Sequence, residues 1–413
     1  MSVRLATEND VPRILEIYAP YVENPAVRFE YTVPTLAEFT ARFLEITARF
    51  PWLVWEEEGV VLGYAYGSLP FERAAYQWSA AVSVYLCAAA QGRGIGRALY
   101  AELERLLRLQ GYRKVYAVIT TANEASVAFH RAVGYRHTAT MPDCGYKFGR
   151  WYGTVWMEKE LNGWDVPPHP PLSAHEVVDA VRVMSYNTQH CLNFVTREID
   201  FDLIADTIRA CGADIVGLQE IRGAGEDEEY QAQAQILAEK LGFHYYFAEA
   251  IRFGGNNPYG NALLSRYPII AAETVSIPDP AVKGYDGYYE TRCVLKATVE
   301  VGDGLTVLVS HFGLNPDEQK NAVRTVLPLL RDTRCIFMGD LNVTPDNAVL
   351  LPIRERLCDT AGVFTAPKLS FPSDEPTVKI DYIFASGDLR VVEADIPAIV
   401  SSDHRPHVAT VRT

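Results

Sequence analysis

Polar side chains that could do chemistry recur in the second half of this chain where apolar segments end. They stand in six short stretches: Met184–Asn187, Gly217–Glu220, Ser310–His311, Gly339–Asn342, Lys379–Phe384 and Ser402–His404. Apolar runs lead into them, as Asp214–Leu218 leads to Glu220 and Cys335–Met338 leads to Asp340. An ionisable group buried beside such strands is costly unless it is paired, hydrogen-bonded or metal-bound. The recurrence therefore predicts one shared site.

The residue types in this set indicate a hard divalent cation. Any one of them has an ordinary structural explanation, such as a turn residue for Asp340 or a surface residue for His404. Six stretches in one consistent order are not explained in that way. Carboxylate and amide oxygens, without paired Cys or His ligands, suit Mg²⁺ or Mn²⁺ better than structural zinc.

The order and wording of these stretches resemble the endonuclease/exonuclease/phosphatase superfamily from Val181 to Val411. The resemblance implies an α/β fold, a four-layer sandwich with two central mixed sheets, and hydrolysis of a phosphoester. It implies metal binding by Asn187, Glu220 and Asp403. The implied catalytic residues are Asp340 for the attacking water, Asn342 and His311 for the phosphate, His404 for the phosphoryl oxygens and Asp381 to orient His404. Weaker matches near the cleft are Asn261 and Arg292.

The charge distribution narrows the substrate. Residues 1–161 hold 17 basic and 17 acidic side chains, so the net charge of −14 falls entirely on the remainder of the chain. Neutralisation of phosphates by Lys and Arg dominates the affinity of proteins for nucleic acid. Bulk nucleic acid is therefore disfavoured, and we expect a small phosphomonoester or a phosphodiester of low charge. A Mg²⁺-dependent nuclease is the alternative.

The first half contains a glycine-rich turn, Gln91–Gly96, between a strand-like segment and a helical one. Leu99, Leu103, Leu106 and Leu107 share one helical face, and Gly111 is a plausible end for that helix. Such a turn points backbone N–H groups at one spot, where the helix dipole also favours an anion. A pyrophosphate is the expected ligand. A dinucleotide fold is disfavoured because the turn lies in mid-domain.

This half resembles the GNAT acyltransferase superfamily from Val3 to Leu161. The phosphinothricin-type N-acetyltransferases are its most similar subgroup, on Arg28–Glu30, Ser83–Tyr85 and Lys147–Trp151. The resemblance implies a mixed α/β fold, acetyl-CoA as the acyl donor and an amine as the acceptor. It implies that acetyl-CoA is bound by Gln91, Gly92, Arg93, Gly94, Ile95 and Gly96, with Asn123 near the pantetheine and Tyr135 on the strand that follows.

One departure from the subgroup concerns the general base. The subgroup has Glu where this chain has Ala81. Attack by an amine requires loss of the ammonium proton, usually to a positioned base or a water chain. Glu30 and His137 are possible substitutes. The alternative is an inactive module that senses acetyl-CoA and regulates its neighbour.

The length of 413 residues exceeds what one hydrophobic core supports. Four prolines in Val166–Pro171 predict a stiff break. We expect an acetyltransferase-like domain over 1–161, a Pro-rich linker over 162–180 and a phosphoesterase domain over 181–413. Neither a transmembrane run nor a signal peptide is evident. Seven scattered cysteines without a Cys-x-x-Cys pair favour the cytoplasm, and the oligomeric state stays open.

Overall fold

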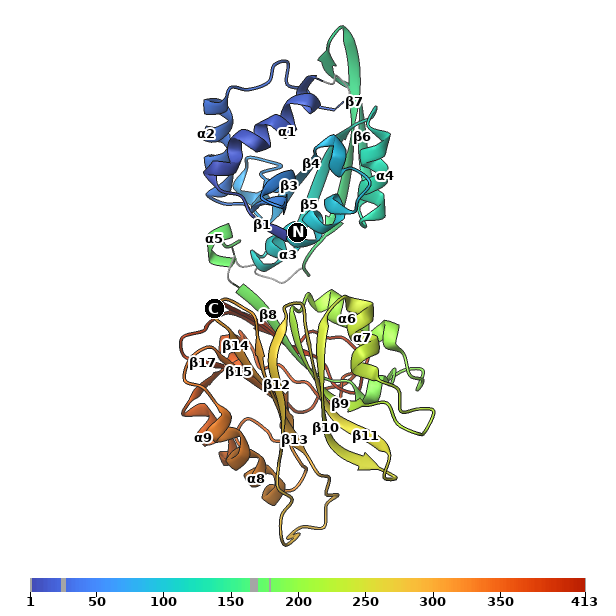
Figure 1. Ribbon diagram of the computed structural model, residues 1–413, viewed down its shortest axis with the longest axis vertical. Helices are drawn as coiled ribbons and strands as arrows, with labels where there is room; N and C mark the ends of the chain where they lie inside the picture. The colour runs from blue at the N-terminus through green and yellow to red at the C-terminus, as the bar shows by residue number, and fades with distance from the viewer. Residues whose placement is uncertain (1, 24–26, 164–169, 178–179, 413) are drawn as a thin grey trace. The chain divides into compact units, whose positions relative to one another are not determined.

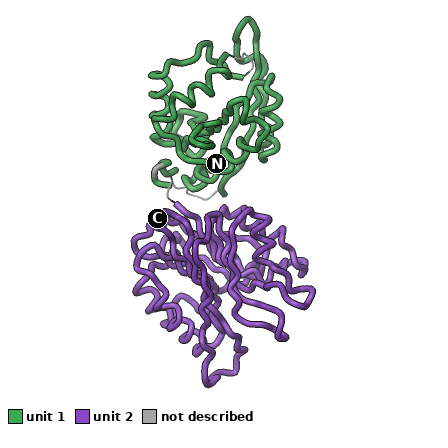
Figure 2. The backbone as a smooth tube through the Cα atoms, in the orientation of Figure 1, with its two compact units in different colours: residues 1–178 green, residues 179–413 purple. Residues whose placement is uncertain are grey.

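A computed structural model describes residues 2–23, 27–163, 170–177 and 180–412. The chain divides into two compact units, residues 1–178 and 179–413 (Figure 2). Both units combine helices with mixed sheets, which confirms the expected α/β class for each. Among the described helices, none has both the length and the apolar character needed to cross a bilayer.

Unit 1 is built on one seven-stranded sheet with the order β1-β2-β3-β4-β5-β7-β6. Its strands are β1 (Ser2–Leu5), β2 (Trp52–Glu57), β3 (Val60–Ser68), β4 (Ser79–Leu86), β5 (Lys114–Thr120), β6 (Arg136–Lys147) and β7 (Arg150–Glu160). Its helices are α1 (Val11–Glu23), α2 (Leu36–Thr47), α3 (Ile95–Leu109), α4 (Glu124–Ala132) and α5 (Ala174–Val177) (Figure 1).

The helices of unit 1 bury the faces that their spacing predicts. An aromatic-rich core joins α1 and α2 to β2, β3 and β4, with Tyr18, Phe39 and Tyr64 fully buried in it. The leucine face expected from Leu99 to Leu107 is buried on α3, which contacts β2, β3 and β4. The glycine turn is thereby fixed at the start of a well-anchored helix.

The sheet of unit 1 opens between its two parallel strands. β4 and β5 pair only from Ser79–Ala81 to Lys114–Tyr116, although both strands continue for several residues. Beyond that point their backbone groups have no common ladder. The two strands therefore diverge and leave a gap in the middle of the sheet.

Unit 2 contains two six-stranded sheets, β10-β11-β9-β8-β19-β18 and β12-β13-β14-β15-β17-β16. The first comprises β8 (Ala180–Asn187), β9 (Ile215–Arg222), β10 (His244–Phe253), β11 (Asn257–Ser265), β18 (Arg390–Asp395) and β19 (His407–Arg412). The second comprises β12 (Ile269–Ser276), β13 (Cys293–Val299), β14 (Leu305–His311), β15 (Cys335–Asp340), β16 (Leu357–Asp359) and β17 (Asp381–Ser386). The helices are α6 (Phe201–Cys211), α7 (Gln233–Leu241), α8 (Pro316–Val326) and α9 (Leu351–Arg354).

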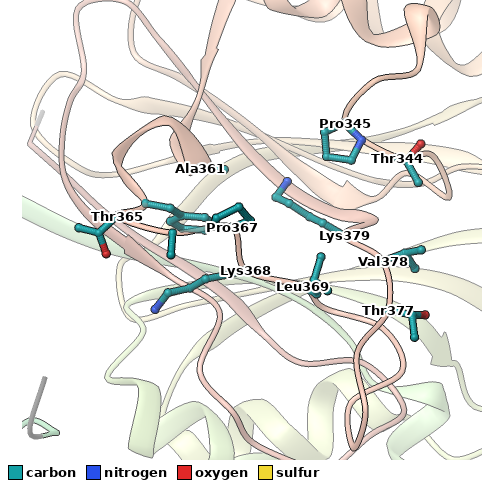
Figure 3. A pocket seen from close by; sticks show the side chains of 12 residues that line it. Thr344, Pro345, Ala361, Thr365, Pro367, Lys368, Leu369, Thr377, Val378 and Lys379 are labelled. Atoms are coloured by element: carbon teal, nitrogen blue, oxygen red, sulfur yellow. The ribbon is translucent and has the colours of Figure 1, made fainter.

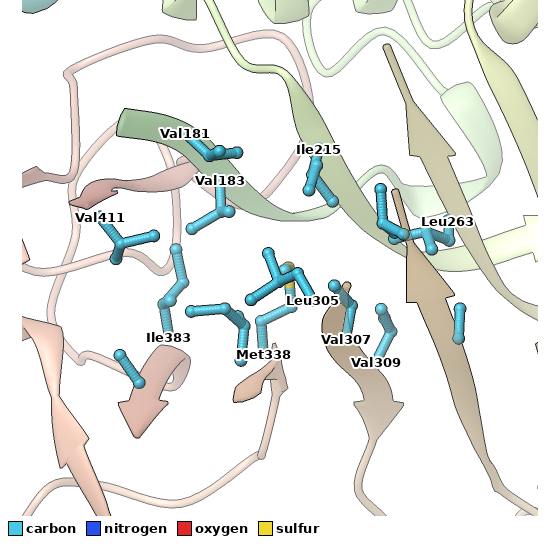
Figure 4. Close-up of a cluster of buried hydrophobic side chains, with 14 of the residues drawn as sticks. Val181, Val183, Ile215, Leu263, Leu305, Val307, Val309, Met338, Ile383 and Val411 are labelled. Carbon is cyan, nitrogen blue, oxygen red and sulfur yellow. The ribbon is translucent and has the colours of Figure 1, made fainter. Parts of the chain in front are cut away.

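Alternation along the strands of unit 2 produces its layers. In β8, Val181 and Val183 enter the core between the two sheets, which Figure 4 shows, whereas Met184 and Tyr186 pack under α6 and α7. In β15, Met338 joins the same central core and Phe337 packs with residues of α8 and α9. The order is thus helices, sheet, sheet, helices, which confirms the expected four-layer sandwich.

The segment expected as a linker differs in part from that expectation. Residues 164–169 and 178–179 lie outside the described residues. The described remainder packs onto unit 1, because Leu172 N donates to Gln110 O at 2.8 Å and Ala174 N donates to Arg49 O at 3.1 Å. The short helix α5 follows, with Val177 fully buried. A buried apolar side chain thus holds part of this Pro-rich segment against unit 1.

Candidate functional sites

The strand pairing of unit 2 brings polar residues of both sheets together. In the first sheet β8 runs parallel to β9, with Asn187 opposite Gln219. In the second, β14 runs parallel to β15, and Asp340 lies opposite His311 on one side and Asp381 on the other. The carboxyl ends of parallel strands meet at one edge of a sheet. Both edges are therefore polar at the same end.

Asn187 connects the two sheets at this edge. Its Nδ2 donates to Glu220 Oε1 at 3.0 Å in its own sheet and to Asp340 Oδ2 at 3.1 Å in the other. Its Oδ1 accepts from Gln189 N at 3.1 Å. Asn187 and Asp340 are both buried, so these bonds form away from bulk water. The site is one contiguous cluster rather than two.

A bulge turns Glu220 towards this cluster. The pairing of β9 with β11 shifts register between Gly260 and Ala262, and Glu220 adopts φ +60°. A bulge re-aims a side chain, and a left-handed backbone at a non-glycine residue is strained. Asn261, within the same irregularity, donates to Cys293 O at 3.2 Å. Asn261 therefore ties the sheets together and has no bond to the cluster among the described residues.

His404 lies between two carboxylates. Its Nδ1 is 2.9 Å from Asp381 Oδ2, and its Nε2 is 3.6 Å from Asp340 Oδ2. Burial lowers the pKa of His404, but Asp381 and Asp340 outweigh that effect and raise the pKa to about 10. Burial raises the pKa of Asp340, while His404 opposes that rise. We assign the proton of this coupled group to the imidazole, because two carboxylates face the ring.

Asn342 and His311 complete the wall beside Asp340. Asn342, at φ +51°, donates its backbone N–H to Asp340 Oδ1 at 3.0 Å, and its Nδ2 lies 3.1 Å from His311 Nε2. Arg292 Nη1 is 3.0 Å from His311 Nδ1. Arginine can only donate, so this ring nitrogen is the acceptor. Burial, with help from Arg292 and His404, lowers the pKa of His311 well below its usual value, and the ring is neutral.

The predicted metal ligands can be tested against the chemistry around them. Burial raises the pKa of Asp403, and the nearby carboxylate of Glu220 adds to that effect. Two carboxylates that repel each other beside the amide of Asn187 form an oxygen-rich set, which suits a hard cation. Asp381 Oδ1 is also buried without a hydrogen-bond partner among the described residues. The donor set fits a divalent ion.

The tightest cluster of possible ligand atoms among the described residues has a different membership. One atom each from Asp340, Asp381 and His404 lie within 4.8 Å of one another. Both nitrogens of the His404 ring already face carboxylates. We therefore interpret these three residues as a hydrogen-bonded charge relay and place the cation at the Asn187 end of the site.

A cavity of about 460 Å³ in unit 2 does not coincide with this cluster. Thr344, Phe364, Pro367, Leu369 and Lys379 are among the residues that line it (Figure 3). None of the predicted site residues does so. Lys379 is buried, and its Nζ lies 3.4 Å from the centroid of the Tyr382 ring. The polar edge, rather than this apolar hollow, contains the groups suited to phosphate chemistry.

Unit 1 contains a cavity of about 370 Å³ at the gap between β4 and β5. Residues 82–86 and 117–120 form its sides, where the two strands diverge. Gln91, Gly92 and Gly96 of the glycine turn line it, as does Asn123 at the start of α4. A tunnel between diverging strands that meets a helix N-terminus is suited to an extended ligand with a phosphate group.

The glycine turn has the backbone that its sequence suggests. Gly92 and Gly94 adopt φ +74° and +81°, and Gly94 is the N-cap of α3. Arg93, Gly94 and Ile95 do not line the cavity, and Arg93 Nη2 bonds Glu57 Oε1 at 2.8 Å. These residues shape the turn with their backbone.

Two other predicted cofactor residues have structural partners. Asn123 Oδ1 accepts from Ser126 N at 3.2 Å and caps α4. Tyr135 is buried outside the cavity lining, and its hydroxyl donates to Glu104 Oε1 at 2.9 Å. Asn123 is therefore placed beside a ligand, whereas Tyr135 supports the packing behind it.

Neither of the bases considered from the sequence lines the cavity. Arg42 Nη2 donates to Glu30 Oε1 at 2.6 Å, and the Tyr18 hydroxyl also bonds Glu30. Although burial alone would raise the pKa of Glu30, these two bonds lower it. His137 is exposed and contacts Thr140 Oγ1 at 2.8 Å. The cavity must obtain its base from another residue.

His130 is the titratable residue that sequence reasoning missed. It lines the cavity from α4, and its Nδ1 lies 2.7 Å from Ser126 O, so Nδ1 carries the proton. Its Nε2 lies 3.0 Å from the hydroxyl of Tyr100, which also lines the cavity. Burial lowers the pKa of His130, which keeps it neutral and able to accept a proton. The sequence signal was a histidine beside Phe129 in an otherwise amphipathic helix.

Comparison with known proteins agrees with both architectures. The Endonuclease/Exonuclease/phosphatase family profile matches residues 184–404, and the acetyltransferase (GNAT) domain profile matches residues 3–156. The chain thus belongs to the endonuclease/exonuclease/phosphatase family through unit 2 and to the GNAT acetyltransferases through unit 1.

Individual relatives fall on the two halves separately. Phosphinothricin N-acetyltransferase of Streptomyces viridochromogenes is 34% identical over 170 residues, 41% of this chain and 92% of the relative. L-amino acid N-acyltransferase MnaT of Escherichia coli is 37% identical over 166 residues, 39% of this chain and 95% of the relative. A solved endonuclease/exonuclease/phosphatase from Beutenbergia cavernae is 25% identical, with a TM-score of 0.45, covering 56% of this chain and 71% of that one.

Proposed function

We propose that unit 2 is a divalent-metal-dependent phosphoesterase. The observation that carries the proposal is the buried contact of Asp340 with Asn187, near the His404 imidazolium and the neutral His311. Asp340 is positioned to orient a water and accept its proton. The His404 cation and the Asn342 amide are positioned to stabilise charge that develops on the phosphoryl oxygens.

Asn187, Glu220 and Asp403 would hold the metal. When bound, a divalent ion supplies Lewis-acid polarisation of the phosphoryl oxygen and neutralises negative charge. Asp381 keeps the His404 ring in place through the 2.9 Å contact at Nδ1, a usual arrangement for a functional imidazole. No cysteine or serine nucleophile is required, so we expect no covalent intermediate.

The test is a panel of small phosphomonoesters and phosphodiesters, assayed with the full chain. Phosphate or alcohol release should require Mg²⁺ or Mn²⁺ and should stop with EDTA. Hydrolysis that continues unchanged in EDTA would reject the metal requirement. Plasmid cleavage at the same metal concentration tests the nuclease alternative, which the net charge of −14 disfavours.

For unit 1 we propose acetyl transfer from acetyl-CoA to a small primary amine. The cavity, its glycine turn and the start of α3 support acetyl-CoA as the donor. The names of the relatives point to amino-acid-like acceptors. The amine nitrogen attacks the thioester carbonyl, an N–C bond forms, the C–S bond breaks, and the CoA thiolate leaves.

Tyr100 and His130 provide a route for the proton. The amine proton passes to the Tyr100 oxygen as the Tyr100 proton moves to His130 Nε2, and the reverse transfer then protonates the thiolate. His130→Gln should reduce acetyl transfer by on the order of 10²-fold and leave the dissociation constant of acetyl-CoA unchanged. If the variant turns over like the wild type, this route is wrong.

The sensing alternative predicts a different result. Saturating acetyl-CoA would then change the KM or kcat of the phosphoesterase while no amine is acetylated. Ala81 is the feature that motivates this reading. Assaying phosphoester hydrolysis with and without acetyl-CoA, beside an amine panel, separates the two functions.

A further inference from the structure

Arg28 presents a guanidinium to the cavity of unit 1 without an acidic partner. Its Nε donates to the Tyr18 hydroxyl at 3.1 Å and its Nη2 to the Tyr66 hydroxyl at 3.2 Å. The rings of Tyr18 and Tyr85 flank it, with centroids 5.7 and 5.4 Å from Cζ. Within the part of the chain that the structure describes, it forms no ion pair with a carboxylate. A guanidinium has five N–H donors, so several remain for a ligand.

The surroundings of Arg28 add positive charge. The ammonium of Lys147 is buried and donates to Arg28 O at 2.7 Å. The nearby carboxylate of Glu30 is already paired with Arg42 at 2.6 Å. Partly buried cations are costly unless an anion compensates them. This end of the cavity therefore favours an anionic group.

The position of Arg28 along β4 separates it from the glycine turn. Arg28 contacts Tyr66, which pairs with Ser83 just after β4 and β5 part. Gln91 and Gly92 lie beyond the other end of β4 and line the same cavity. A donor whose pyrophosphate binds the glycine turn would leave the Arg28 end for the acceptor.

We infer that Arg28 binds the carboxylate of the acceptor, so that unit 1 acetylates compact α-amino acids. The inference rests on the proposed acetyl transfer and specifies the substrate class. The planar fork of arginine matches a carboxylate with two parallel hydrogen bonds, which also fixes orientation. In an α-amino acid the amine is one carbon from that anchor, so binding at Arg28 positions the nucleophile.

The experiment compares L-methionine sulfone with its α-carboxamide, which keeps the amine and loses the charge. The wild type should prefer the acid. Arg28→Gln should lower kcat/KM for the acid by about 10²-fold and for the amide by less than about threefold, because truncating one partner of a desolvated charge pair is costly. Arg28→Lys should fall between them, since lysine is a point charge. Arg131→Gln, an exposed arginine on α4, is the matched control and should behave like the wild type.

Calorimetric titration of acetyl-CoA checks that the Arg28 variants remain folded, since its affinity should not change. Equal rates on acid and amide in the wild type, or equal losses on both in Arg28→Gln, would overturn the inference. If the wild type acetylates neither probe, acetyl transfer fails as its function. Titration of L-methionine sulfone into the CoA-bound protein then decides. Binding that Arg28→Gln weakens supports the carboxylate anchor, and absent or unaffected binding rejects it.

Discussion

At the residue scale, the candidate phosphoesterase site concentrates charge in a small buried space. Asp340, Asp381 and His404 are all buried, and the imidazole separates the two carboxylates. Low effective dielectric strengthens the contacts among them and makes each one costly to leave unpaired. Single substitutions here should therefore change both the chemistry and the charge balance.

Asp340→Asn and His404→Ala should each lower kcat for phosphoester hydrolysis by on the order of 10²–10⁴. Asparagine keeps the shape of Asp340 but cannot accept the proton of water, and alanine removes the imidazolium. Initial rates at saturating substrate and metal give the comparison. A nearly wild-type kcat in either variant would contradict the assigned roles. Glu355→Gln, an exposed change in the same unit, serves as the control.

Acid stability of unit 1 should depend on Asp10. A hydrogen bond from Arg4, outweighing the effect of burial, lowers the pKa of Asp10 to about 2. The unfolded chain has a pKa of about 3.9 for aspartate, so this stabilisation is complete above that value and disappears as pH falls towards 2. Asp10→Asn should lower the free energy of unfolding at pH 7 and flatten its decline below pH 4. Urea unfolding between pH 2 and 7 measures this, and exposed Glu45→Gln should leave the curve unchanged.

At the element scale, irregular backbone does much of the positioning. Glu220 sits in a bulge of β9 and Asn342 follows β15, both in the left-handed region. In unit 1, limited pairing between β4 and β5 creates the cavity, and Gly94 begins α3. These deviations from regular strands and helices place side chains and N–H groups where a ligand can meet them.

Gly94 and Gly111 offer a matched pair at the two ends of α3. Their φ values are +81° and +90°, and a Cβ at either would meet open space. Gly94→Ala and Gly111→Ala should both destabilise unit 1 by about 1–2 kcal/mol, because an L residue is strained there. Only Gly94→Ala should weaken acetyl-CoA binding, which calorimetry measures. Equal affinities in the two variants would argue against the glycine turn as the phosphate site.

At the scale of the whole molecule, each unit has a sheet and a core of its own. The aromatic cluster around Tyr64 belongs to unit 1, whereas the core around Val183 and Met338 lies between the sheets of unit 2. Units with separate cores commonly unfold in separate transitions, and a ligand stabilises only the unit that binds it.

Calorimetric melting should therefore respond to the two ligands separately. Acetyl-CoA at a hundredfold excess over its dissociation constant should raise one transition by roughly 5–10 °C, and Mg²⁺ or Mn²⁺ at a similar excess should raise the other. EDTA should reverse only the second shift. Acetyl-CoA that moves both transitions equally would instead indicate that the units unfold together.

Much of this protein can be predicted from the sequence because its chemical residues follow apolar strands in a consistent order. That pattern predicted both fold families, the glycine turn before α3 and the stretches that contain Asn187, Glu220, Asp340 and His404. Periodicity also predicted the buried leucine face of α3. These are local properties of strand ends and helix faces, which short-range sequence patterns record.

Only the tertiary structure revealed which groups face one another. The bond from Asn187 to Asp340 joins different sheets, and His130 meets Tyr100 from a separate helix. Tyr135 shows the converse, since its hydroxyl bonds Glu104 outside the cavity lining. Arg28 gained its significance from the tyrosines around it and from the absence of an acidic partner among the described residues. Such relations depend on packing between distant segments, which composition and spacing along the chain do not encode.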